Sequence, residues 1–334
     1  MLPPIPIDQI LDAIPTFQKL RVLVVGDFFL DEYVEGEMFE ISKEGPIPVI
    51  RFESRVGAAG AAGNLAASIR NLGAHVKVVG LVGDDENGRT LTAELEEKRI
   101  DTTGLLVDRS QRTHTYGKYR ARVENAPSRE ILRIDILPGG PIPGDVEARV
   151  LEATQKAASD VDGIIVLDQV NHLITPRLLK VLPALAKSRG ALLHGSSRDR
   201  IGEFHDFDLI IPNDLEASAA LVGNSAQLPV EELGEGLKKA SGHIQVLVTL
   251  GPDGMAVFPR QGPMVKVPTF ADEVVDVTGA GDAVASTAML ANLLGWDLTT
   301  VAWTASQSAA IALAHVGTHH VTREELVERI TRQR

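Results

Sequence analysis

The stretch HVKVVGLVGDDENGRTLTAELEEKRI, residues 75–100, predicts one buried strand followed by one helix. Valine and leucine dominate its first half without polar alternation, which is typical of a strand covered on both faces. Its second half spaces apolar residues at helical intervals. A strand–helix unit of this kind favours a parallel sheet with helices on its faces.

The same alternation continues on both sides of this unit. Further buried strands are expected at 21–27, 163–168, 191–195, 208–213 and 244–251, and further helices at 61–73, 144–159 and 176–190. A short N-terminal helix is also expected, because apolar side chains recur there at helical spacing (Ile10, Leu11, Ile14 and Phe17). The pattern predicts an α/β fold with a mostly parallel central sheet, organised as one domain over residues 1–334.

Two segments interrupt the alternation, at about 32–54 and 113–136. Both carry short alternating patterns with turn residues, which predict antiparallel strands inserted in the main domain. We expect them to meet as a small sheet that covers a ligand as a lid and excludes water. An exposed sheet edge invites pairing with a second copy, so a homodimer through the lid is expected.

Composition restricts the classes of partner. The net charge of −12, with no cluster of lysine and arginine, argues against nucleic acid. The chain has no cysteine, which excludes disulfides and thiolate metal sites and suits the cytoplasm. No apolar run reaches the roughly 20 residues that span a bilayer, so no membrane contact is expected. The N-terminus does not resemble a signal peptide, because Asp8 and Asp12 break its apolar part.

The stretch DVTGAGDAVASTAM, residues 276–289, predicts an anion site. We expect a short strand within 270–277, a glycine-rich turn and then a helix. The amides of Thr278 to Gly281 would then be free at the helix N-terminus, where the dipole favours negative charge. Asp282 would lie in the first helical turn and accept a hydroxyl proton, which suits phosphoryl transfer. The alternative is an ordinary capped helix N-terminus.

Polar groups at other strand ends point to the same crevice, since ligands of parallel sheets bind at the carboxyl ends of the strands. Near the first strand, carboxylates and an amide beside a glycine-rich turn suit the hydroxyl groups of a sugar: Asp27, Asp31, Gly60 and Asn64. Close packing of small residues is the alternative there.

Two later motifs each allow a binding and a structural interpretation. In PNDLE, Asn213 and Glu216 suit Mg²⁺ held through water, or a helix capping box. In VTLGPDGMAVF, Thr249, Gly251 and Gly254 allow a nucleotide to approach the backbone, or form a hairpin turn. Walker A and GxGxxG motifs do not occur; Val284 stands where the third glycine would be.

The order of these motifs resembles the ribokinase-like (PfkB) carbohydrate kinases over residues 21–327. DVTGAGDA is similar to that family's C-terminal signature, GAAGN at 60–64 to its N-terminal signature, and PNDLE and TLGPDG to its magnesium and nucleotide motifs. The resemblance implies a three-layer α/β/α fold with a small β lid, and ATP- and Mg²⁺-dependent phosphorylation of a sugar hydroxyl. It implies Asp282 as the base, an anion hole of Gly279, Ala280 and Gly281 amides, and Thr278 and Ser306 on the nucleotide side.

Within that family, RVLVVGDFFLDEYVEGEMFEISKEGPIPVI and GKYRARVENAPSREILRID resemble D-glycero-D-manno-heptose 7-phosphate kinases. This resemblance implies transfer to the 1-position of that sugar phosphate. Lys118, Arg120 and Arg133 then become candidates to bind the substrate phosphate, or they are solvated lid charges. Two alternatives stay open: a kinase for ribose, fructose, fructose phosphate or a nucleoside, and a non-catalytic sugar-binding protein.

The sequence departs from the family pattern at several positions. Ala61 replaces a signature glycine, Ser196 replaces an aspartate, and Ser306 replaces an asparagine. Where the heptose kinases have Asp-Tyr-Gly-Lys-Gly, Asp168 is kept, but Gln169, Val170 and Asn171 replace the residues that follow it. We expect these changes to shift substrate or nucleotide preference rather than abolish transfer.

Two expectations concern other cations. Family members often bind K⁺ at backbone carbonyls beside the anion hole, here the region of Asp272, Val274 and 314–318. A transition-metal site is not expected, because His319 and His320 have no partner at ligand spacing along the chain.

Overall fold

The computed structural model describes residues 2–123, 127–169, 172–223, 228–242 and 244–334. Asn171, one of the departures noted above, lies outside them. Within the described residues a nine-stranded sheet has the order β13-β12-β11-β10-β9-β8-β1-β4-β5. Its strands are β1 Arg21–Gly26, β4 His75–Gly83, β5 Asp101–Asp108, β8 Gly163–Asp168, β9 Leu192–Ser197, β10 Leu209–Ile210, β11 Gln245–Thr249, β12 Met255–Phe258 and β13 Val265–Val267.

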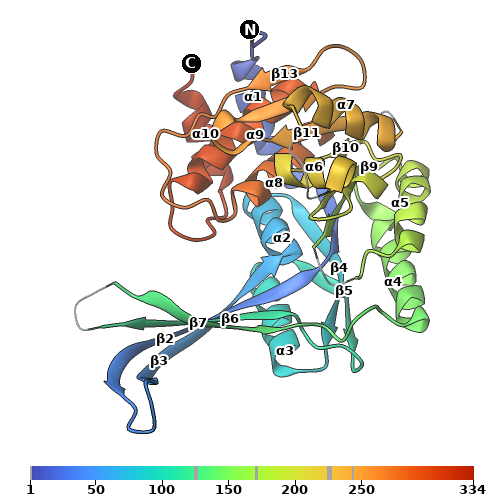
Figure 1. The fold of residues 1–334 in the computed structure, drawn as a ribbon. Helices are drawn as coiled ribbons and strands as arrows, with labels where there is room; N and C mark the ends of the chain where they lie inside the picture. Colours follow the sequence, from blue (N-terminus) through green and yellow to red (C-terminus); the bar gives the residue numbers. More distant parts are fainter. Residues whose placement is uncertain (1, 124–126, 170–171, 224–227, 243) are drawn as a thin grey trace.

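The sheet is parallel from β5 to β11, and β12 and β13 complete it in antiparallel pairing. Helices cover both faces (Figure 1). They are α1 Ile7–Ala13, α2 Ala62–Asn71, α3 Glu86–Glu97, α4 Gly144–Ala157, α5 Pro176–Arg189, α6 Asp214–Val222, α7 Val230–Ala240, α8 Ala280–Leu293, α9 Leu298–Leu313 and α10 Arg323–Thr331. Short 3₁₀ helices lie at Ile14–Lys19, Ala158–Asp160, Ile201–Glu203 and Gly251–Asp253. The predicted three-layer α/β fold is confirmed.

Alternation along β1 divides the apolar core in two. Val22 and Val24 join the cluster under α2, α8 and α9, whereas Leu23 and Val25 join the cluster under α4, α5 and α7. Successive side chains of a strand point to opposite faces, so one continuous apolar strand supplies both clusters. The N-terminal helix packs on the first cluster through Ile10, as its spacing predicts.

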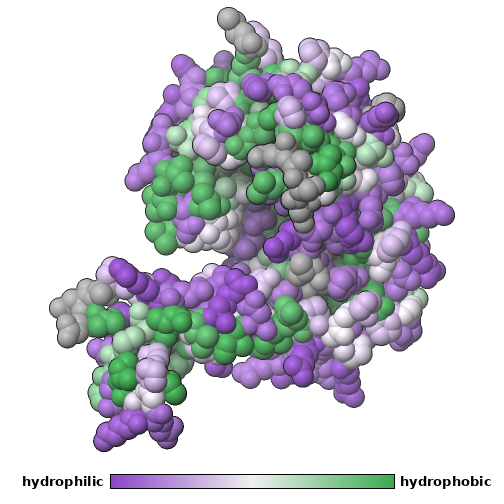
Figure 2. Space-filling model, viewed as in Figure 1, coloured by the Kyte–Doolittle hydropathy of each residue, from purple (hydrophilic) through white to green (hydrophobic). Residues whose placement is uncertain are grey.

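Four long strands form the lid: β2 Phe28–Ile41, β3 Pro48–Ala61, β6 Thr115–Arg122 and β7 Arg129–Ile136. Their order is β3-β2-β6-β7, with antiparallel pairs at the sides and a parallel β2–β6 pair in the middle. The sheet projects from the body (Figure 1), and Figure 2 shows a deep hollow between the two. The expected small sheet is therefore present.

The two faces of the lid differ in chemistry. Register places Asp31, Tyr33 and Lys118 on one face, and alternation places Leu132 and Ile134 on the other. Hydrophilic residues line the side of the lid that faces the hollow, with hydrophobic ones beyond them (Figure 2). The lid therefore offers polar groups to the crevice and leaves an apolar outer surface.

One element prediction was wrong: no strand forms within 270–277 in this described stretch. The amides of Val275 and Asp276 instead bond to a single acceptor, the carbonyl of Leu313 at the end of α9. The stretch is therefore tied to a helix end rather than to a strand. None of the helices in the described residues is both long and apolar enough to cross a membrane.

Candidate active site

A tight turn that ends at Gly279 leads into the N-terminus of α8. Gly279 caps the helix at φ +81°, and a Cβ there would lie 2.9 Å from Cγ2 of Thr318. This position therefore needs glycine, both for its backbone angle and for the close approach of the neighbouring loop. Within the described residues, the amides of Gly279, Gly281 and Asp282 donate no hydrogen bond.

Two amides expected to be free are engaged. The N–H of Thr278 donates to Oδ1 of Asp276 at 2.9 Å, and that of Ala280 donates to the carbonyl of Val277 at 3.3 Å. Oδ2 of Asp276 accepts the N–H of Gly317 at 2.9 Å, which fixes the turn against the loop after α9. These hydrogen bonds, with Thr278 the largest contributor, hold the pKa of Asp276 below its usual range.

Asp282 follows in the first turn of α8, as predicted. Asp282 as a whole is partly exposed, but its carboxyl group is surrounded by protein. This burial raises the pKa of Asp282 to about 7. A carboxylate with a pKa near neutrality is suited to take up and release a proton at cellular pH.

A cavity of about 310 Å³ adjoins this helix N-terminus. It is lined by four residues proposed for the nucleotide side (Thr249, Gly251, Gly254 and Ser306), together with Ala280 and Gly281. The sequence did not reveal its apolar walls, which come from Met255, Val274, Val277, Val284, Ala309 and Leu313. A largely apolar pocket with a few polar groups suits a planar base.

Two of these lining residues also have structural roles. Gly254 adopts φ +83°, and a Cβ there would lie 2.2 Å from the carbonyl oxygen of Val267. The hairpin therefore requires this glycine whether or not a nucleotide binds. Ser306 donates its hydroxyl to the carbonyl of Pro268 at 3.1 Å, so its side chain is already held at the cavity wall.

Asn213 and Glu216 form the capping box that was the structural alternative. Oδ1 of Asn213 accepts the amide of Glu216, and Oε2 of Glu216 accepts the amide of Asn213, both at 2.8 Å. Burial raises the pKa of Glu216, although the bond from Asn213 opposes this. A buried carboxylate with a second oxygen outside the cap is compatible with a divalent cation held through water.

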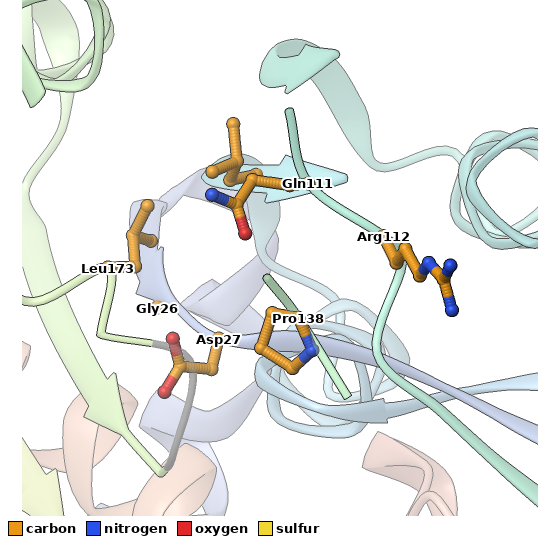
Figure 3. A pocket seen from close by; sticks show the side chains of 7 residues that line it. Gly26, Asp27, Gln111, Arg112, Pro138 and Leu173 are labelled. Carbon is orange, nitrogen blue, oxygen red and sulfur yellow. The ribbon is translucent and has the colours of Figure 1, made fainter. Parts of the chain in front are cut away.

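On the sugar side, Asp27 lies at the carboxyl end of β1 and is almost completely buried. Its Oδ2 accepts the amide of Gln169 at 2.7 Å. Figure 3 shows its carboxylate near a small recess walled by Gln111, Pro138 and Leu173, while the Arg112 side chain points away. The recess measures about 10 Å³, room for about one water molecule. The sequence did not reveal Gln111 or Pro138, because they lie in two separate loops far along the chain from Asp27.

Asp31, Gly60 and Lys118 come together at the base of the lid. Nζ of Lys118 lies 2.8 Å from Oδ1 of Asp31 and 3.2 Å from the hydroxyl of Tyr33. Burial alone would lower the pKa of Lys118, but its interactions with Asp31 and Tyr33 together outweigh burial and raise it. A Cβ on Gly60 would lie only 2.8 Å from Oδ2 of Asp31, so a side chain at this position would displace the carboxylate.

The remaining predicted residues have partners elsewhere. Asn64 lies in the first turns of α2, with its Oδ1 3.4 Å from Nε2 of His320. Arg120 pairs with Glu35 at 2.9 Å, and Arg133 pairs with Asp135 through two bonds of 2.7 Å. Both arginines are thus held by acidic groups of the lid itself.

Residues at and beside the departures from the family pattern make structural contacts. Asp168, which keeps the family pattern next to the departures that follow it, is buried, with its carboxylate 2.9 Å from Arg200 and 2.7 Å from the hydroxyl of Ser197. Ser196 donates to the carbonyl of Ile211 at 3.2 Å. Ala61 adopts φ 49° and ψ −119°, a conformation that favours glycine.

Phosphoryl transfer to an alcohol is the chemistry that such an arrangement serves, and comparison with known proteins agrees. The chain belongs to the pfkB family of carbohydrate kinases, whose family model matches residues 20–325. It is therefore a phosphotransferase that acts on a sugar hydroxyl.

Its relatives include proteins named bifunctional protein HldE. That of Citrifermentans bemidjiense is 32% identical over 93% of this chain and 63% of the relative. That of a Caulobacter species is 34% identical over 96% of this chain and 65% of the relative. The chain thus spans less than two thirds of the length of these relatives.

Solved structures share the fold. Phosphofructokinase-2 from Escherichia coli in complex with potassium aligns with a TM-score of 0.73 at 17% identity, covering 94% of this chain and 99% of that one. Arabidopsis thaliana ribokinase complexed with ribose and ATP aligns with a TM-score of 0.68 at 20% identity, covering 93% and 98%. At these identities the likeness establishes the architecture.

Proposed function

We propose that the chain uses ATP to phosphorylate the 1-hydroxyl of D-glycero-D-manno-heptose 7-phosphate. The observation that carries the chemistry is Asp282, whose pKa burial raises to about 7, next to unbonded amides and a cavity of about 310 Å³. The choice of sugar is supported by the resemblance of residues 21–50 and 117–135 to heptose 7-phosphate kinases. Similarity to the HldE proteins over more than nine tenths of the chain agrees with it.

In the proposed reaction Asp282 takes the proton of the sugar hydroxyl. The sugar oxygen forms a bond to the γ-phosphorus as the bond to the β-phosphate oxygen breaks, and ADP leaves. The N–H groups of Gly279 and Gly281 donate to the equatorial oxygens of the transferring group, where charge is spread. Ala280 contributes the helix backbone between them, and Thr278 holds the turn through Asp276.

ATP would lie between the 249–254 turn and α9, with its base against the apolar wall of the cavity and beside Ser306. Glu216 would hold Mg²⁺ through water from its capped position beside Asn213. When bound, Mg²⁺ neutralises charge on the phosphates.

The sugar would lie under the lid. Asp27, Asp31 and Asn64 present oxygen and amide groups to its hydroxyls, with Gly60 leaving space beside Asp31. Lys118 is the lid cation closest to this set, since it already contacts Asp31. We assign the substrate phosphate to Lys118, with Arg120 and Arg133 exchanging their lid carboxylates for it.

A substrate panel with coupled detection of ADP tests this proposal. We expect heptose 7-phosphate to give a kcat/KM at least tenfold above heptose, ribose, fructose and fructose 6-phosphate. Lys118→Met should raise KM for heptose 7-phosphate while leaving KM for ATP within twofold. A phosphate-free sugar working best would reject the role of Lys118, and no ADP with any sugar despite sugar binding would favour a non-catalytic sugar-binding protein.

One observation favours a kinase for a different sugar as the second candidate. Ser196 stands where the heptose kinases have an aspartate, and its hydroxyl donates to the backbone carbonyl of Ile211. Ribose, fructose, fructose phosphate and nucleosides are the alternatives that the same panel separates.

We further propose one domain over residues 1–334 with the lid inserted in it, a cytoplasmic location that suits a consumer of ATP, and a homodimer through the outer lid face. A K⁺ site would lie in the region of Asp272, Val274 and 314–318. Contact between these two segments supports it, since the amides of Val275 and Asp276 bond to Leu313 and Gly317 bonds to Asp276. Replacing KCl by NaCl in the assay tests that site.

A further inference from the structure

Three metal-ligating side chains converge beside the phosphoryl-transfer site, in a group that the proposed mechanism does not use. His315 and His319 lie in the loop after α9, and Glu325 lies in the first turn of α10. One ligand atom from each lies within 4.8 Å of the other two. The sequence hides this cluster, because Glu325 follows His319 by six positions across a loop and a helix start.

Hydrogen bonds already orient the two histidines. Nδ1 of His315 lies 2.9 Å from the carbonyl oxygen of Ile311, which only accepts, so Nδ1 carries the proton and Nε2 keeps its lone pair. The two imidazole rings stack at 3.8 Å with only 9° between their planes. A backbone carbonyl that fixes the tautomer is a usual support of a metal-binding histidine.

The carboxylate is held in the same way. Oε2 of Glu325 accepts both the amide and the hydroxyl of Thr322 at 2.7 Å, while Oε1 lies 3.0 Å from Nε2 of His319. Two ligands of a tetrahedral zinc ion lie about 3.4 Å apart, so this pair needs little movement to share an ion. The separations in the cluster, at most 4.8 Å, must close by no more than about 1.4 Å, and His315 is the exposed side chain of the three. Binding also requires the two stacked rings to turn out of parallel, because an imidazole lone pair lies in the plane of its ring.

We propose that His315, His319 and Glu325 bind one divalent transition-metal ion of the zinc class. Two imidazoles and a carboxylate form a ligand set that such an ion prefers, with a fourth position for water. In the metal-free protein the His319–Glu325 hydrogen bond occupies the place of the ion.

An ion at this position would bind on both sides of the segment that lies next to the α8 N-terminus. Between the ligands, Gly317 bonds to Asp276 and Thr318 packs against Gly279, while His320, next to His319, reaches Asn64. A bound ion would therefore fix the segment 314–320, which contacts both the helix N-terminus and the sugar side.

The test is zinc titration of the metal-stripped full chain, without ATP or Mg²⁺, by competition with a colorimetric chelator. We expect one Zn²⁺ per chain, with affinity at least tenfold weaker in His315→Ala and Glu325→Gln and unchanged in the control His205→Ala, an exposed histidine elsewhere. Glu325→Gln keeps an acceptor for the capping box, and His315 takes no part in that box, so both variants should fold.

Hydrogen exchange supplies a second readout that is independent of activity. Zn²⁺ should slow exchange in 314–320 of the wild type and leave His315→Ala unchanged. The proposal is overturned if the wild type binds no stoichiometric zinc, or if His315→Ala and Glu325→Gln bind it as the wild type does. Either result leaves the kinase proposal standing, because the ADP assay measures it separately.

Discussion

Asp282 combines two properties that a general base needs: a place at the helix N-terminus and a carboxyl group removed from water. Desolvation disfavours the charged form, which is why the pKa rises from 3.8 to about 7. The dipole of α8 acts in the opposite direction and favours the anion. The balance leaves a group that is partly ionised at neutral pH.

Replacing this base should remove turnover without removing the fold. We expect Asp282→Asn to lower kcat by about 10²- to 10⁴-fold, because proton transfer by a positioned base contributes about that much. ATP affinity should change little, since the cavity walls stay in place. In the wild type, kcat/KM should rise with pH through about 7 as Asp282 ionises.

Stability supplies the control for this variant. The folded protein holds the proton of Asp282 up to a pH of about 7, whereas the unfolded chain releases it at about 3.8. The free energy of unfolding of the wild type should therefore decrease as the pH rises from about 3.8 to about 7. Asp282→Asn should therefore be more stable than the wild type at pH 8 and show little difference below pH 4, in urea unfolding at both values. Unchanged turnover together with this stability gain would show that Asp282 is buried but is not the base.

At the scale of elements, the junction of β3 and α2 stores strain. Ala61 has φ 49° and ψ −119°, where the family signature usually has glycine. A non-glycine residue there costs on the order of 1–3 kcal/mol. The strain lies between the sugar-side glycines and the helix that carries Asn64.

Ala61→Gly should relieve part of that strain. We expect the free energy of unfolding to increase by about 1 kcal/mol, after allowing for the greater backbone entropy of glycine. The matched control is Ala67→Gly in the interior of the same helix, which should lose about 1 kcal/mol or more. Urea unfolding of both variants measures the difference, and a loss of stability in Ala61→Gly would show that the backbone there is not strained.

Periodicity made most elements predictable, because continuous apolar strands such as β8 and amphipathic helices such as α5 carry their signal locally. The prediction of a strand within 270–277 was wrong. The valines of this stretch are typical of a strand, but the amides of Val275 and Asp276 donate to the carbonyl of Leu313, which lies far along the chain. The parts of the candidate site also differ in how far the sequence predicts them. Motifs predicted the α8 turn and the capping box, but the apolar nucleotide wall and the His315–His319–Glu325 cluster depend on contacts between distant segments.

The whole molecule has a net charge of −12 and a lid whose outer face is apolar. Leu132 and Ile134 are 52% and 47% exposed, on the face opposite Lys118. An exposed apolar sheet face of this kind is typical of a surface that pairs.

Assembly through that face can be tested by a single charge. We expect the wild type to be a dimer and Ile134→Glu a monomer in light scattering after size-exclusion chromatography, because a buried unpaired carboxylate opposes association. Val107→Glu changes an exposed valine on β5, away from the lid, and should leave the dimer intact. A wild type that is monomeric at assay concentration, or an Ile134→Glu dimer, would contradict the assignment.

Only Asp27 separates β1 of the main sheet from the lid strand β2. The 14 residues of β2 extend roughly 45 Å, so a swing of 5° at that single residue would carry the far tip through about 4 Å. The amide of Asp27 donates to Leu167 of β8, and its carboxylate accepts the amide of Gln169, just after β8. The residue that joins β1 to β2 is thus one of the groups proposed to bind the sugar, so a sugar bound at Asp27 would act directly on one of the connections between the lid and the main sheet.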